Sequence, residues 1–298
     1  MKSLLSPGLA RLARLRFTVA YVAALTAVSA VIFAIGPAER DRLVERASTN
    51  LHNLGHGHLG TLLSSAFVVD AGPIYFWLPF LTCLLALAEL QLRTVRLILV
   101  FIVGHIGATL VVAAALAAAV QLGWVPPSIS RASDVGMSYG ALAALGALTT
   151  TIPARWRAAW VGWWVAVSAT ACVMGGEFTN AGHAIALSLG VLVAARFDRP
   201  VRWTPLRVAM LLASSGFGFL MLSHDGGLMV VAVVIGLLGA VTAYTITYDR
   251  HLRHALEAVM HSVRTGSSTK ESAAAWVINP STCRRRRWPR RSKQRGRP

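Results

Sequence analysis

The chain has 298 residues, of which 55% are hydrophobic and only 14% are charged. A soluble globular protein carries about 25% charged residues, so the composition excludes the ordinary soluble enzymes. The net charge of +17 comes mainly from the end of the chain, because residues 284–298 contain nine Lys and Arg and no acid. The sequence therefore predicts an all-α polytopic membrane protein with a basic tail.

Eight uncharged stretches are long enough, or nearly so, to cross a bilayer core that needs about 20 apolar residues. An N-terminal segment, 1–16, precedes a predicted six-helix core over 17–200. The six core spans are expected at about 17–36, 71–90, 97–120, 135–154, 158–176 and 178–195. The segment 201–250 adds two spans, at about 207–224 and 226–248, before a tail, 251–298, that we expect to be disordered.

Basic residues recur at alternate ends of these spans. They precede span 1 and follow spans 2, 4, 6 and 8, at Lys2, Arg11, Arg14, Arg16, Arg93, Arg96, Arg155, Arg157, Arg196, Arg199, Arg202, Arg207, Arg250 and Arg253. Cytoplasmic loops carry the excess of Lys and Arg in membrane proteins. We therefore expect a multi-pass protein of the cell membrane with both termini in the cytoplasm.

The tail and the loops offer few other binding sites. The four arginines at 284–287 favour contact with anionic lipid head groups, to which each cation contributes about 1 kcal/mol, over nucleic acid. Three cysteines form neither a disulfide framework nor a metal-binding spacing. His52, His56 and His58 could bind a metal by spacing, but no other obvious ligand adjoins them. We expect no metal and no cofactor.

A G-x-S-x-G motif at residues 136–140 opens span 4, with Ser138 at its centre. In an α/β-hydrolase this motif lies on a turn between a strand and a helix, and this chain has no comparable sheet. Span 6 carries His183, and an ionisable side chain inside a span indicates a functional site. Both spans enter from the outer face, so at 1.5 Å per residue the two side chains lie at a similar depth.

Small residues recur every fourth position on both helices, at Gly136 and Gly140 on span 4 and at Gly182, Ala186 and Gly190 on span 6. Such stripes allow two helix backbones to approach closely. A serine becomes a useful nucleophile when a nearby base takes its proton, as a neutral histidine can near pH 7. The pattern predicts that spans 4 and 6 pack together and bring Ser138 to His183.

With these two motifs, the sequence resembles the rhomboid family of intramembrane serine proteases over about residues 50–200, and more narrowly the divergent rhomboid-like membrane proteins of high-GC bacteria. The resemblance implies a rhomboid-like six-helix core with two additional C-terminal helices. It also implies that Ser138 is the nucleophile and His183 the general base, and that the partners are membrane-protein substrates.

The chain departs from the family on span 2. Where the family has a His and an Asn that help to form the oxyanion hole, this chain offers Tyr75 and Pro79. Proline has no amide donor. The candidates for the oxyanion hole are therefore Tyr75 and Asn180, in addition to the backbone N–H of Ser138. A rhomboid-like pseudoprotease that binds membrane clients without cutting them is therefore an alternative, and a small transporter, favoured by His105, is a third.

Three further polar residues have simpler expected roles. Glu89 is expected to pair with Arg93, four residues along the same helix. His105, in span 3, is expected to bond a carbonyl of a neighbouring helix. Asp134 is expected to cap span 4.

The charge pattern predicts the topology directly. A reporter fused after Asp134 should be external, and reporters fused after Arg157 or Arg253 should be cytoplasmic, because the basic loops stay inside. Enzymatic reporters that are active on one side of the membrane would measure this, and an external Arg157 fusion would reverse the orientation.

Overall fold

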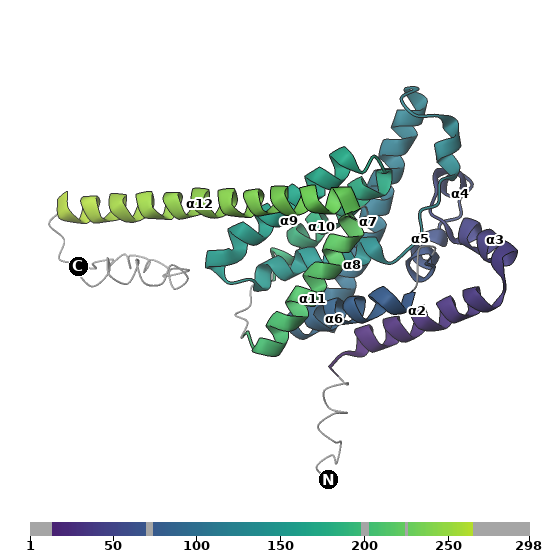
Figure 1. The fold of residues 1–298 in the computed structure, drawn as a ribbon, viewed down its shortest axis with the longest axis horizontal. Helices are drawn as coiled ribbons and strands as arrows, with labels where there is room; N and C mark the ends of the chain where they lie inside the picture. The colour runs from purple at the N-terminus through teal and green to yellow at the C-terminus, as the bar shows by residue number, and fades with distance from the viewer. Residues whose placement is uncertain (1–13, 70–73, 198–202, 224–225, 265–298) are drawn as a thin grey trace, which may run out of the picture. The chain divides into compact units, whose positions relative to one another are not determined.

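The computed structural model describes the chain apart from residues 1–13, 70–73, 198–202, 224–225 and 265–298 (Figure 1). The described elements are all helical: α2 (Arg16–Ala34), α3 (Pro37–Ala47), α4 (Leu51–Gly55), α5 (Thr61–Ser64), η1 (Ser65–Phe67), α6 (Ile74–Leu92), α7 (Thr94–Gln121), η2 (Pro127–Arg131), α8 (Ser138–Ala147), η3 (Leu148–Thr151), α9 (Ala154–Met174), α10 (Phe178–Ala194), α11 (Pro205–Leu222) and α12 (Gly226–Arg264). The predicted all-α class is confirmed.

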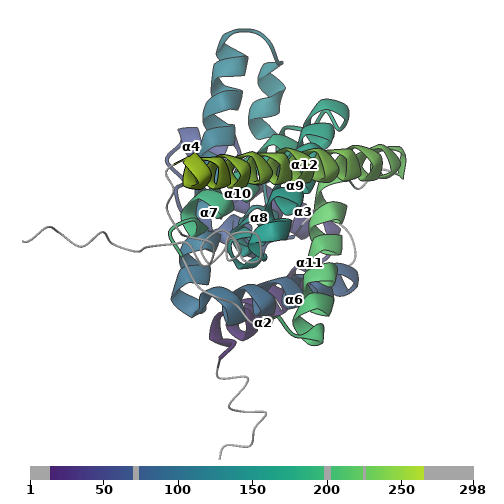
Figure 2. The same cartoon turned by 90° about the vertical axis from the view of Figure 1, so that its left-hand side faces the viewer.

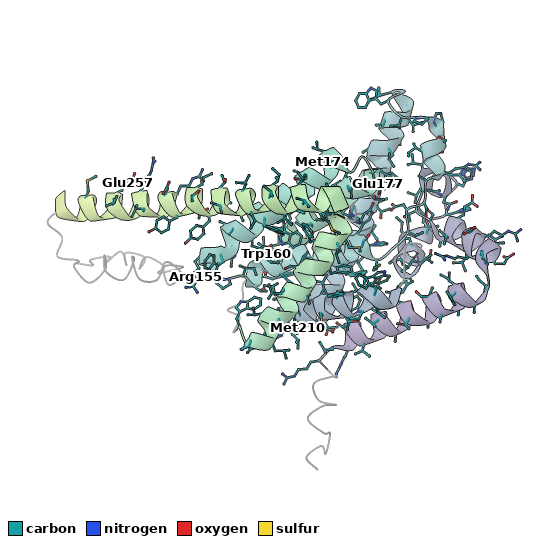
Figure 3. The ribbon with its side chains drawn as sticks, viewed as in Figure 1. Arg155, Trp160, Met174, Glu177, Met210 and Glu257 are labelled. Atoms are coloured by element: carbon teal, nitrogen blue, oxygen red, sulfur yellow. The ribbon has the colours of Figure 1, made fainter. Side chains whose placement is uncertain are left out.

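Four of the described helices are long and apolar enough to cross a membrane: α2, α7, α11 and α12 as far as Arg250. Two shorter apolar helices, Phe76–Leu92 and Phe178–Ala194, lie within α6 and α10. Charged residues lie at opposite ends of α9: Arg155 is near its start and Glu177 lies beyond its last residue (Figure 3). These helices agree with a multi-pass membrane protein.

The fourth predicted span, 135–154, differs most from the structure. The helix α8 has only 10 residues, Ser138–Ala147, before the chain tightens into η3. At 1.5 Å per residue it covers only about half of a bilayer core of ~30 Å. Irregular backbone at membrane depth is tolerated only where protein covers it. The structure meets this condition, because every residue of α8 after Ser138 is buried.

Helix α8 lies at the centre of the helices around it. It packs most extensively against α10 and α7, and it also contacts α6 and α11 (Figure 2). Glycines make the closest approaches possible: a Cβ added at Gly104 of α7 or at Gly190 of α10 would overlap Ala143, and one at Gly146 would overlap the Leu187 carbonyl. The predicted contact between spans 4 and 6 is therefore present.

The residues on the α8 side of that contact differ from those predicted. Gly140 faces the ring of Phe101 on α7 instead of α10. Gly136 precedes α8, has a φ of +126°, and has open space where a Cβ would lie. On α10 the assignment is closer, because Gly182 faces the Tyr139 ring and Ala186 is fully buried.

Glu89 is buried, with 2% of its surface exposed, and it anchors the start of α2. Its Oε1 accepts from Phe17 N at 3.0 Å and from Thr94 Oγ1 at 2.7 Å. Its Oε2 accepts from Thr18 N at 2.9 Å and from Thr18 Oγ1 at 2.7 Å. The first N–H groups of a helix lack helical acceptors and attract negative charge. The carboxylate is thus used between helices and not in the expected pair with Arg93.

Two helices follow the six-helix core. Helix α11 packs against α6 and α8, with Gly218 set against Leu145 and Trp164. The first part of α12 packs against α9, where Gly239 lies over the Gly162 carbonyl.

The backbone contacts divide the chain after Val241 into two units. In the second unit α12 continues to Arg264, so the helix extends into the first residues of the predicted tail. Residues 265–298, which include the arginines expected to contact lipid head groups, lie outside the described residues.

Replacement of Glu89 should destabilise the protein. Glu89→Ala leaves buried donors at the start of α2 unpaired, at about 1–3 kcal/mol for each unsatisfied group, so we expect a total loss of several kcal/mol in unfolding free energy. Glu45→Ala is the matched control, because Glu45 is exposed. Titration of unfolding in mixed detergent micelles measures both, and equal stability of the two variants would contradict the assigned role.

Replacement of Gly190 tests the closest helix contact. Gly190→Leu should lower the unfolding free energy by at least about 3 kcal/mol, since overpacking of a fitted interior typically costs 1–3 kcal/mol and here the collision is with backbone atoms of Ala143. Gly216→Leu on α11 is the control, because nothing lies within 4 Å of its Cβ position. Similar stability of the two variants would rule out the close approach.

Candidate active site

The structure brings Ser138 and His183 together. Ser138 is the first residue of α8 and is half-buried, while His183 lies on α10 with 8% of its surface exposed. The His183 Nε2 atom is 2.9 Å from the Ser138 Oγ atom, a hydrogen-bond distance. A serine and a histidine at this distance have the geometry that activation of a nucleophile requires.

Ser138 lies at a helix start because the preceding loop is held from outside α8. Asp134 N donates to Ser48 Oγ at 2.8 Å, and Thr49 N donates to the Asp134 carbonyl at 3.0 Å. Gly136 N donates to the Ser65 carbonyl at 2.8 Å. The long segment between the first two apolar helices therefore fixes the backbone that leads into the serine.

The sequence predicted that Asp134 caps α8, and the structure shows that it does not. Its Oδ2 accepts from Thr49 Oγ1 at 3.4 Å, and α8 has no side-chain cap at its start. Burial raises the pKa of Asp134 to about 6, and the nearby hydroxyls of Tyr139 and Thr49 offset this only in part. Asp134 helps to hold the loop that precedes α8, and its side chain does not accept from the N–H groups in the first turn of α8.

Tyr139 is a site residue that the sequence interpretation did not single out. Its ring centroid lies 5.4 Å from that of His183, with an interplanar angle of 78°, which is the edge-to-face arrangement that aromatic rings prefer. Gly182, next to His183, leaves room for the tyrosine ring, because a Cβ there would overlap it. In the sequence, the tyrosine within the serine motif and the glycine before the histidine were the features that could have indicated this contact.

Backbone donors lie beside the Ser138 hydroxyl. The N–H groups of Ser138, Tyr139 and Gly140 belong to the first turn of α8, where helical acceptors are absent by geometry. The first helical bond runs from Ala141 N to the Met137 carbonyl at 3.0 Å. A helix start of this kind stabilises a negative oxygen. The site therefore has backbone N–H groups without helical acceptors next to the serine in the chain.

The two predicted side-chain donors are not brought to the serine by any described contact. Asn180 is buried one turn before His183, with its Nδ2 against Gly175 at the end of α9. Tyr75 lies in the first turn of α6, and its side chain is outside the described residues. Pro79 lies inside α6 and supplies no N–H group.

The other histidines have different surroundings. The rings of half-buried His52 and exposed His56 have centroids 4.3 Å apart and are tilted by 51°. Among the described residues no cluster of three His, Cys, Asp or Glu side chains could hold a metal ion. His105 does not bond a helix carbonyl as expected; its Nε2 lies 3.1 Å from Ser65 Oγ.

Comparison with known proteins decides the family. A family model described as rhomboid-like protein matches residues 12–198 of the chain. The chain belongs to the rhomboid-like family. The match extends from the start of α2 to the end of α10, so this rhomboid-like protein has both Ser138 and His183 inside the family region. Helices α11 and α12 follow it. No curated protein and no solved structure matches the chain.

Proposed function

We propose that this rhomboid-like protein is an intramembrane serine endopeptidase that cleaves the transmembrane segments of other membrane proteins. The observation that carries the proposal is the 2.9 Å distance between His183 Nε2 and Ser138 Oγ. The pair lies on two helices that are held together by close glycine contacts, so the distance does not depend on a flexible loop.

The proposed reaction uses Ser138 as the nucleophile. Its Oγ bonds to the carbonyl carbon of the substrate while its proton moves to His183 Nε2. The negative oxygen that forms is stabilised by N–H groups in the first turn of α8, and loss of one such donor typically costs about 10²–10³ in rate. His183 returns the proton to the leaving amine as the C–N bond breaks, and water then hydrolyses the ester in the same way. The Tyr139 ring keeps the imidazole in place.

The proposed setting is the cell membrane, with both termini cytoplasmic and the serine near the outer face. The distribution of basic residues along the chain supports this orientation. The partners are membrane-protein substrates, and the basic tail adds contact with anionic lipid head groups.

Client binding without cleavage is the second candidate function. The observation that favours it is Pro79 inside α6, because proline cannot donate a hydrogen bond from its backbone. In this case the same helices would retain a membrane segment, and the Ser138–His183 hydrogen bond would serve packing alone.

Substitution of the pair tests the protease. Ser138→Ala and His183→Ala should each lower labelling by a serine-directed fluorophosphonate by at least about 10³-fold, and should lower cleavage of a helical substrate by the same factor. The first variant lacks the nucleophile and the second lacks the base that activates it. Thermal unfolding should change little, since alanine is tolerated in close-packed helices. Ser188→Ala is the control, because that exposed hydroxyl on α10 donates to the Ala184 carbonyl of its own helix.

The outcomes separate the two candidates. Unchanged cleavage by the Ser138→Ala protein would rule out the protease. A wild-type protein that never labels, but retains a crosslinked membrane segment that Gly190→Leu releases, would favour client binding.

A further inference from the structure

We propose that Ser65 and His105 form a second Ser/His pair, which positions the catalytic pair and does not react with substrate. The inference rests on the proposed function, because it assigns a role within the same site. Ser65 is fully buried and His105 is 4% exposed. Their Oγ and Nε2 atoms are 3.1 Å apart, although 40 residues separate them in the chain.

Ser65 links this pair to the serine loop through its own backbone. Its carbonyl accepts from Gly136 N at 2.8 Å. Gly136 has a φ of +126°, a backbone conformation that favours glycine, and it precedes Ser138 by two residues. The hydroxyl bond to His105 fixes η1 against α7, and the carbonyl then fixes the point at which the loop turns into α8.

His105 supports the same turn of α8 from the other side. Its ring lies 6.4 Å from the Tyr139 ring, and the Tyr139 ring lies 5.4 Å from that of His183. One turn earlier on α7, Phe101 stacks near His105 and fills the space at Gly140. The pair therefore acts on Ser138 through Gly136 and on His183 through Tyr139.

Burial decides that the pair is positional. With 0% and 4% of their surfaces exposed, neither side chain reaches a substrate. Reaction rates are sensitive to such support, because a displacement of about 1 Å at the reacting atoms can lower the rate 10²-fold.

The test compares Ser65→Ala, His105→Phe and the double variant in the full-length protein. Ser65→Ala keeps the carbonyl that binds Gly136 and removes only the hydroxyl bond, while His105→Phe keeps a ring beside Phe101 and Tyr139. We expect each to lower kcat by about 10- to 100-fold with KM unchanged. The double variant should be no slower than the slower single variant, because both remove one interaction.

Two further variants separate position from stability. His105→Gln should be faster than His105→Phe, since its side-chain amide can bond Ser65, although it lacks the ring that lies near Tyr139. Thr109→Val, one turn along α7, is the control, because the buried Thr109 hydroxyl has no partner among the described residues. A His105→Gln protein as slow as His105→Phe, or additive losses in the double variant, would overturn the proposal.

Hydrogen exchange of the peptide covering residues 134–140 gives a second measurement that does not require activity. Exchange should become faster in Ser65→Ala and His105→Phe and stay unchanged in Thr109→Val. If wild-type protein is not labelled by a fluorophosphonate, the proposed function fails and the exchange result alone decides the positioning. If wild type is labelled and Ser65→Ala matches it in both rate and exchange, only the positioning proposal fails.

Discussion

The close approach of three helices at Ala143 is the constraint on which the rest of the structure depends. Gly104 of α7 and Gly190 of α10 both face this residue, and neither position has room for a side chain. A helix as short as α8 cannot cross a membrane, and its irregular ends must be covered by protein. Because the covering helices come so close, α8 can begin part-way through the fold and present Ser138 at its start.

A helix that begins inside the protein has chemical consequences. Its first N–H groups have no helical acceptors, so they are available beside the serine hydroxyl. The chain connecting α2 to α6 is anchored to the preceding loop by Ser48, Thr49 and Ser65. Glu89 joins the far end of α6 to the start of α2 in a similar way. Buried polar groups thus hold the helices where apolar packing alone would leave their register free.

The additional helices surround this core without supplying either member of the Ser138–His183 pair. Ser138 and His183 both fall within the matched family region, which ends at residue 198. Helix α11 lies against α6 and α8. It therefore covers part of the central helix from outside the matched region.

The sequence by itself determined the helical class, the approximate bounds of most helices and the meeting of α8 with α10. Hydropathy indicates where the helices lie in the chain, and the rise per residue gives the depth of each side chain along its helix. Only the tertiary structure decided that α8 is short. An apolar stretch of sequence can form one spanning helix or a short helix followed by buried irregular backbone, and both are equally apolar. It also decided that Gly140 faces Phe101, since a stripe of small residues does not specify its partner. The bonds of Glu89 to Thr18 and of Ser65 to His105 join positions 71 and 40 residues apart, and no local pattern encodes contacts at such separations.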